Sequence, residues 1–159
     1  MEANGRSAWK GAAAGLAGGL VASFAMDRFQ ALWARQVDMP KGGDPATVRA
    51  AQKVSRAATG EYVAKANKQK AGQVVHYLFG AALGTAYGLV AEYRPGVTKG
   101  FGSRFALAAA TAFDELAVPA AGLGTAPTEA PAKSHAYGYV SHLVFGGVTE
   151  GVRRLLRRR

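Results

Sequence analysis

The stretch AGQVVHYLFGAALGTAYGLVA, residues 71–91, decides the fold, because its 21 residues include no Asp, Glu, Lys or Arg. An α-helix needs about 20 mainly apolar residues to cross about 30 Å of hydrocarbon. This stretch is long enough by itself, and Tyr93 and Arg94 behind it are residue types typical of the membrane interface. The sequence therefore predicts a membrane-spanning helix over 71–93.

Three more apolar segments lie at 11–33, 101–123 and 136–156, and each of them contains charged residues. A charged residue is tolerated in a membrane span only where it faces protein or water. We therefore predict an all-α fold, a small polytopic membrane bundle of about four transmembrane helices that forms a single domain over 1–159. Apart from Arg104, Arg153 and Arg154 near the segment ends, the charged residues in question are Asp27, Arg28, Asp114, Glu115 and Glu150.

The first segment also has features of a secretory signal peptide. Arg6 and Lys10 precede its apolar run, and small residues stand at Ser23 and Ala25. Its run is rich in Gly and Ala rather than Leu, however, and apolar residues resume after Arg28. We expect a retained helix, with cleavage as the alternative.

Positive charge is concentrated outside the apolar segments. The net charge is +10, and the basic residues gather in a loop at 37–70 and in an Arg-rich tail at 153–159. Such clusters suit anionic lipid at the loop and at the tail. No nucleic-acid motif accompanies them, so no nucleic-acid partner is expected. A mean hydropathy of −0.01 is low for a membrane protein.

The basic loop is expected to contain one short helix. Asp44 and Pro45 are suited to its N-cap and first position, and Gly60 is suited to its end. Its apolar stripe is weak, so it is predicted to lie either on the membrane surface or in solvent.

Small residues recur at four-residue spacing in three of the apolar segments. Residues four apart form a ridge on one helix face, and small side chains there let two helix backbones approach closely within lipid. Each ridge also carries ionisable residues, so we expect that face to point into the bundle. The predicted packing glycines are Gly11, Gly15, Gly19, Gly80, Gly84, Gly88, Gly138 and Gly146.

Helix rise places the ionisable residues of different segments at one level. At about 1.5 Å per residue and with alternating helix direction, they fall roughly 3–9 Å from the midplane on the same side. Histidines and carboxylates held together in this way can change protonation near physiological or mildly acidic pH. The predicted polar layer consists of Asp27, Arg28, His76, Asp114, Glu115 and His142.

Two further features concern the later segments. VVHYLFGAALG from Val74 and VSHLVFGGVTE from Val140 both contain His-x-x-Phe-Gly, and many membrane folds contain such weak repeats. Pro119 lies four residues after Glu115, so its ring leaves the Glu115 carbonyl without a helical donor. We expect Pro119 either to bend the third helix or to end it.

Several stretches together point to a known family. They are HYLFGAALGTAYG (His76–Gly88), DELAVPAAGL (Asp114–Leu123) and SHLVFGG (Ser141–Gly147). With these stretches most of the chain resembles the YagU-like family of bacterial inner-membrane proteins of uncharacterised molecular function. The resemblance implies a multi-pass protein of the bacterial inner (plasma) membrane, but no activity. It marks as signature residues His76, Asp114, Glu115, Pro119 and His142.

Three functions are compatible with the polar layer. The first is a proton or small-cation pathway, or a pH-responsive membrane protein. The second is a structural or assembly role without transport, although an interhelical hydrogen bond in a membrane contributes only about 0.6 kcal/mol. The third is a metal or haem site on His76 and His142, which no HExxH or CxxCH motif supports.

No enzymatic activity is expected. Ser134 and Ser141 lie in no G-x-S-x-G elbow, and the chain has no P-loop. Disulfides and thiolate metal sites are excluded because the chain has no cysteine. We assign no cofactor and no metal ligands. The expected partners are the lipid bilayer and, since four helices leave little room for a pore, a second copy in a homo-oligomer.

Overall fold

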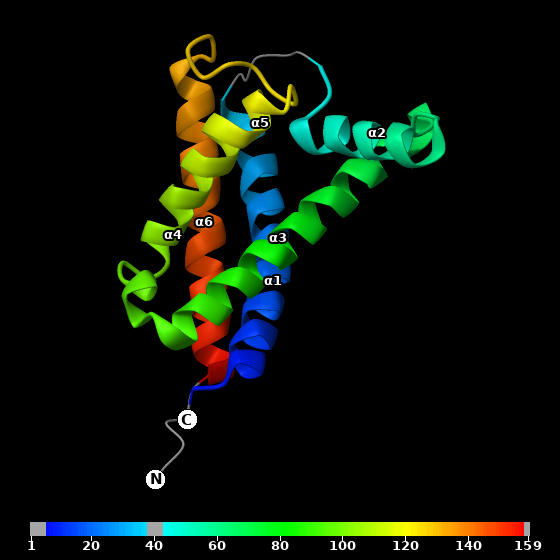
Figure 1. Ribbon diagram of the computed structural model, residues 1–159. Helices are drawn as coiled ribbons and strands as arrows, with labels where there is room; N and C mark the ends of the chain where they lie inside the picture. Colours follow the sequence, from blue (N-terminus) through cyan, green and yellow to red (C-terminus); the bar gives the residue numbers. More distant parts are fainter. Residues whose placement is uncertain (1–5, 38–42, 158–159) are drawn as a thin grey trace.

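The computed structural model describes residues 6–37 and 43–157, and in these ranges it contains helices and no strand (Figure 1). The predicted all-α class is therefore confirmed. In chain order the elements are α1 (Ala8–Gln36), α2 (Ala46–Thr59), η1 (Lys65–Asn67), α3 (Lys68–Tyr93), η2 (Pro95–Thr98), α4 (Ser103–Ala109), η3 (Ala110–Ala117), α5 (Val118–Ala120) and α6 (Ala132–Arg157).

Three long helices and one composite helix form the bundle. Helix α1 packs against both α3 and α6, and α4 packs against the other side of α6. Figure 1 shows α2 lying across one end of the bundle, where α3 begins and α1 ends. The start of α1 and the end of α6 lie together at the opposite end.

One of the described helical stretches, Lys65–Tyr93, is long and apolar enough to cross a membrane, with a mean hydropathy of 1.5. It contains the stretch from which the fold was predicted. By the same measure of length and hydropathy, α1 and α6 do not qualify. They are rich in Gly, Ala and charged residues, which lowers their mean hydropathy.

Glycines set the distance between α1 and α3. A Cβ atom added at Gly84 would lie 2.6 Å from the Gly19 Cα, and one at Gly88 would lie 2.7 Å from the Gly15 Cα. A Cβ at Gly11 would lie 2.7 Å from the Gly88 carbonyl oxygen. The two backbones are thus in direct contact along this ridge, and no larger residue fits there without moving a helix.

The third predicted helix is a continuous helical segment over 103–120 in which the middle part is not an α-helix. Residues 110–117 form a π-helix, in which the Val118 N–H donates to the Phe113 carbonyl five residues earlier. The last helical residue is Ala120, so the expected boundary at 123 lies three residues too far along the chain. Pro119 sits in this last turn, and Gly122 follows with a φ of +63°, a conformation that favours glycine.

The distribution of side chains is the reverse of that in a water-soluble core. Small and polar residues fill the interior: Ser23, Ser141, Thr149 and Glu150 are 0% exposed, and most of the buried apolar residues are alanines. Large apolar residues cover the outside of every bundle helix. Leu32, Leu78, Leu116 and Leu155 are examples, with exposed fractions of 59%, 65%, 61% and 60%.

Candidate functional site: a cavity with two histidine–aspartate pairs

Two His–Asp pairs join the bundle helices near the α2 end. His76 on α3 places its Nε2 3.3 Å from Asp27 Oδ1 on α1. His142 on α6 places its Nδ1 3.3 Å from Asp114 Oδ2 on η3. Gln73 adds a hydrogen bond from its Nε2 to Asp27 Oδ2 at 2.5 Å. Each pair therefore links two different helices of the bundle.

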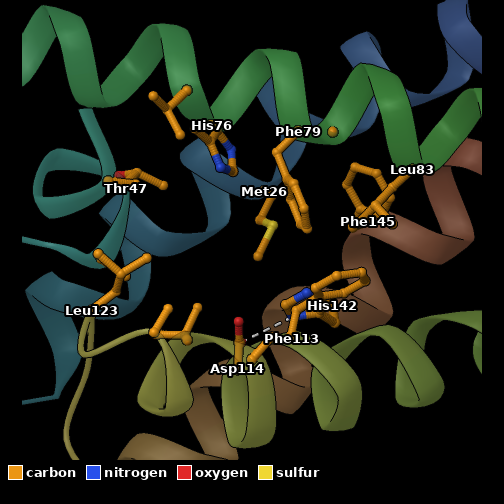
Figure 2. A pocket seen from close by; sticks show the side chains of 17 residues that line it. Met26, Thr47, His76, Phe79, Leu83, Phe113, Asp114, Leu123, His142 and Phe145 are labelled. Atoms are coloured by element: carbon orange, nitrogen blue, oxygen red, sulfur yellow. Dashed lines mark ion pairs between the residues drawn. The ribbon is translucent and has the colours of Figure 1, made fainter. Parts of the chain in front are cut away.

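A partly open cavity of about 340 Å³ lies between the two pairs. Figure 2 shows His76 pointing into it from α3, with Asp114 and His142 on the opposite side. Most of its wall is apolar and includes the aromatic rings of Phe79, Phe113 and Phe145. A few polar groups in an apolar cavity of this size are typical of a small-molecule site.

A second, more polar cavity of about 420 Å³ adjoins the first. Its wall includes Asp27, Gln73 and Tyr137, and it shares His76 and Asp114 with the apolar cavity. Helix α2 contributes Ala46 and Thr47 to both cavities. The basic loop is thus part of the site, which the sequence did not indicate.

No Lys or Arg side chain lines either cavity within the described ranges. Arg28, predicted as part of the polar layer, is exposed and lies over the Phe24 ring at 5.2 Å. Glu115 also points away and accepts a hydrogen bond from His135 Nδ1 at 2.8 Å. The structure brings Asp27, His76, Asp114 and His142 together and directs Arg28 and Glu115 elsewhere.

Adjacent helix positions point about 100° apart, which separates the two carboxylates. Asp114, on the π-helix, projects into the cavity, where its side chain is 43% exposed, while Glu115 faces the start of α6. Gly138 makes room opposite, since a Cβ there would lie 3.2 Å from Asp114 Oδ2. The Gly138 carbonyl also accepts a hydrogen bond from His142 Nδ1 at 3.1 Å. Short π-helical segments are frequent at functional sites.

His135 was missed by the sequence reasoning. Its Nδ1 contacts the Glu115 carboxylate, and its Nε2 lies 3.1 Å from the Pro127 carbonyl oxygen. These two contacts fix the loop before α6. The hydrogen bond to the Glu115 carboxylate raises the pKa of His135 above its usual value, because the protonated ring is held by a negative charge.

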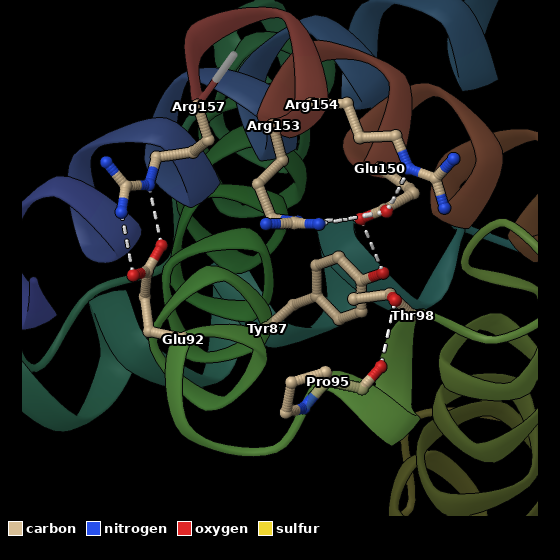
Figure 3. A network of polar contacts seen from close by, with 8 residues as sticks. All are labelled: Tyr87, Glu92, Pro95, Thr98, Glu150, Arg153, Arg154 and Arg157. Carbon is tan, nitrogen blue, oxygen red and sulfur yellow. Dashed lines mark hydrogen bonds and ion pairs between the residues drawn. The ribbon is translucent and has the colours of Figure 1, made fainter. Parts of the chain in front are cut away.

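An ionic cluster closes the other end of the bundle (Figure 3). The carboxylate of Glu150 is fully buried and accepts hydrogen bonds from the Tyr87 hydroxyl at 2.8 Å, Arg153 at 2.7 Å and Arg154 at 2.6 Å. Two guanidinium nitrogens of Arg157 bind Glu92 at 2.6 and 2.7 Å. The sequence signal was available, since Glu92 continues the four-residue series of α3 glycines.

The described residues contain no group of three or more His, Asp or Glu side chains placed to hold a metal ion. His76 and His142, the histidines considered for a metal or haem, each pair with an aspartate instead.

Comparison with known proteins gives one family match. The model of a family described as "Protein of unknown function (DUF1440)" matches residues 43–151, which include His76, Asp114 and His142 and leave out α1. No curated protein and no solved structure matches the chain. An uncharacterised family was expected, and the match confirms that much. The YagU-like name rests on the resemblance alone.

Proposed function

Because the chain belongs to the DUF1440 family of proteins of unknown function, which prescribes no activity, we propose its function from the cavity. It is a multi-pass membrane protein, without enzymatic activity, in which protons change the charge of a cavity at one end of the bundle. The resemblance to inner-membrane proteins favours the bacterial inner membrane. The basic loop and the Arg-rich tail would then meet anionic lipid headgroups.

The reversed distribution of side chains carries the membrane part of the proposal. Leu32, Leu78 and Leu116 are each about three-fifths exposed, at 59%, 65% and 61%, while Thr149 and Glu150 are fully buried. In water this arrangement would leave apolar surface on every helix, which soluble monomers rarely do. In lipid it is the stable one, because small and polar residues then hold the helices together. On this reading α1, α3, α4–α5 and α6 all span the bilayer.

The cavity carries the pH-responsive part. With neutral histidines, Asp27 and Asp114 on the walls of the two adjoining cavities give a charge of about −2, and within the described ranges no Lys or Arg on those walls offsets them. Protonation of either member of a His–Asp pair removes one negative charge from the pair. The cavity therefore loses negative charge as the pH falls.

A pH response at one end of the bundle fits the structure better than a continuous proton pathway through it. Between the cavity and the Glu150 cluster lies an apolar cluster of Ala22, Met26 and Phe145, with Leu83 and Phe105 packed against it. We therefore favour a pH-responsive site over a proton channel within one protomer.

A structural or assembly role is the second candidate. The backbone contacts between α1 and α3 and the buried Glu150 cluster are features of a rigid scaffold. In that case the cavity would have no functional response to protons. The two functions are separated by measuring the charge of the cavity.

The chain has no cysteine, so one reporter thiol can be introduced without background. Thr47→Cys places it on the wall of both cavities. The reporter is treated with a cationic trimethylammonium-ethyl and an anionic sulfonatoethyl methanethiosulfonate. Because both reagents attack the same thiolate, the ratio of their rates reports the local charge rather than the thiol pKa.

We expect the cationic reagent to react faster at pH 8 and to lose this advantage by pH 6. Replacing His76 and His142 by Gln should keep the ratio high across this range, whereas His135→Gln, outside the cavity, should leave the fall unchanged. A ratio that does not vary with pH in the otherwise unmodified chain would favour the structural role.

A further inference from the structure

The two His–Asp pairs sit on helices with matching sequences. GLVASFAMD at 19–27 and ALAAATAFD at 106–114 share Leu, two Ala and the final Asp at equivalent positions. HYLFG at 76–80 and HLVFG at 142–146 share His, Phe and Gly. Each aspartate helix pairs with one histidine helix. The match therefore extends over two hairpins, α1 with α3 and α4–η3 with α6.

The two hairpins also pack in the same register. Gly80, four residues after His76, lies against Gly19, eight residues before Asp27. Gly146, four residues after His142, lies against Ala106, eight residues before Asp114. A Cβ at Gly146 would be 2.7 Å from the Ala106 Cβ, which is nearly as close as the α1–α3 contacts. The His–Asp distance is 3.3 Å in both hairpins.

The hairpins run in the same direction across the bundle. In Figure 1, α1 and α4 run toward the end where α2 lies, and α3 and α6 run back. Such parallel repeats in membrane proteins form their binding sites at the repeat interface. The cavity lies there, and its wall includes three pairs of equivalent residues: Met26 and Phe113, His76 and His142, Phe79 and Phe145.

Helix α2 accounts for the main departure from this symmetry. Asp27 and His76 are 49 residues apart and Asp114 and His142 are 28 apart, so the first connection is longer by 49 − 28 = 21 residues. The added chain holds α2, which lines the cavity from one side. The two matching hairpins thus supply the His–Asp pairs, and the longer first connection supplies one wall of the cavity.

The lining of the cavity favours a ligand that carries a positive charge on an apolar framework. The carboxylate of Asp114 faces a cavity whose described wall contains three phenylalanine rings and no Lys or Arg side chain. A cation is attracted by the carboxylate and by aromatic faces, and both effects strengthen away from water. His142 is 7% exposed, and with Nδ1 donating to Gly138, its Nε2 is an acceptor that makes no hydrogen bond within the described chain. An anion or a strongly polar molecule would find no Lys or Arg side chain on the described wall of this cavity.

We propose that the cavity between the two hairpin repeats binds an organic cation with a bulky apolar body, held between the Asp27–His76 and Asp114–His142 pairs. This proposal rests on the proposed function and adds a ligand class to it. Since each pair loses its negative charge on protonation, protons and the cation compete for the same site. Acidification releases the cation.

Tetraphenylphosphonium and tetraphenylborate test this directly, because they have nearly the same shape and opposite charge. Equilibrium dialysis of the full chain in detergent at pH 8 should show binding of the phosphonium and not of the borate. Asp114→Asn should weaken binding about ten-fold, the effect of losing one nearby charge. Asp27→Asn should act in the same direction, and the neighbouring Glu115→Gln should bind as the unmodified chain does.

A second readout does not depend on the folding of the aspartate variants. In the chain that carries only Thr47→Cys, the phosphonium should slow modification of the thiol and the borate should not. Equal binding of both ions, or unchanged binding by a folded Asp114→Asn, would overturn the proposal. If the thiol ratio still changes with pH and the phosphonium does not bind, only the ligand class is wrong. If the ratio is constant, the proposed function itself fails.

Discussion

Replacing Gly84 by alanine tests how closely α1 and α3 pack. The new Cβ would meet the Gly15 carbonyl oxygen and would lie 2.6 Å from the Gly19 Cα and 2.7 Å from the Gly19 nitrogen. Carbon contacts are normally about 3.5–4.0 Å. All three neighbouring atoms belong to the backbone, so no side chain can rotate away and the helices must separate by about 1 Å.

The expected loss follows from that separation. Overpacking a well-packed contact costs about 1–3 kcal/mol, and a gap of this size also weakens the contacts of neighbouring residues. The free energy of unfolding, measured by SDS titration of the protein in mixed micelles, should therefore fall by about 1–3 kcal/mol.

Gly147→Ala on α6 is the matched control, because no atom lies within 4 Å of its added Cβ. It should be neutral or stabilising, since alanine favours a helix over glycine by up to about 1 kcal/mol. Equal stability of the Gly84 and Gly147 variants would show that the two backbones are not in contact as described.

Two further predictions concern the polar contacts outside the cavity. Glu150→Ala leaves the partly buried Arg153 without its partner and should cost about 3–5 kcal/mol in the same SDS titration, against about 1 kcal/mol for Tyr87→Phe. Similar losses for both would contradict the geometry of the cluster. The raised pKa of His135 means that its contact with Glu115 stabilises the loop below the usual histidine pKa and weakens as the pH rises through the raised value. Hydrogen exchange at residues 127–135 should therefore become faster over that range, beyond the intrinsic pH effect, and His135→Gln should remove the change.

Much of the bundle could be predicted from local patterns. The apolar stretch at 71–91 lies within α3, and four-residue glycine spacing identified the faces on which α1 and α3 meet. These features depend on residues within one helix turn of each other. A pattern of that kind is visible in a single sequence.

The site could be predicted only in part. Helix rise indicated that Asp27, His76, Asp114 and His142 lie near one another, but it could not separate Asp114 from Glu115. Which of the two faces the cavity depends on how their helix is rotated against α6, and helix rise does not give that rotation. The position of α2 could not be predicted either, because the basic loop that contains it is positioned by contacts with helices distant in sequence. Its Lys53, for example, donates to the Ala121 carbonyl at 2.5 Å.

The central claim is that lipid covers the leucines on the outside of the bundle. Nitroxide labels on single cysteines at Leu20, Leu78, Leu116 and Leu143, one for each bundle helix, test it in lipid nanodiscs by electron paramagnetic resonance. All four should collide more often with oxygen, which concentrates in lipid, than with a water-soluble nickel chelate, while a label at exposed Glu129 should show the reverse. Nickel accessibility at the leucines equal to that at Glu129 would contradict the membrane bundle.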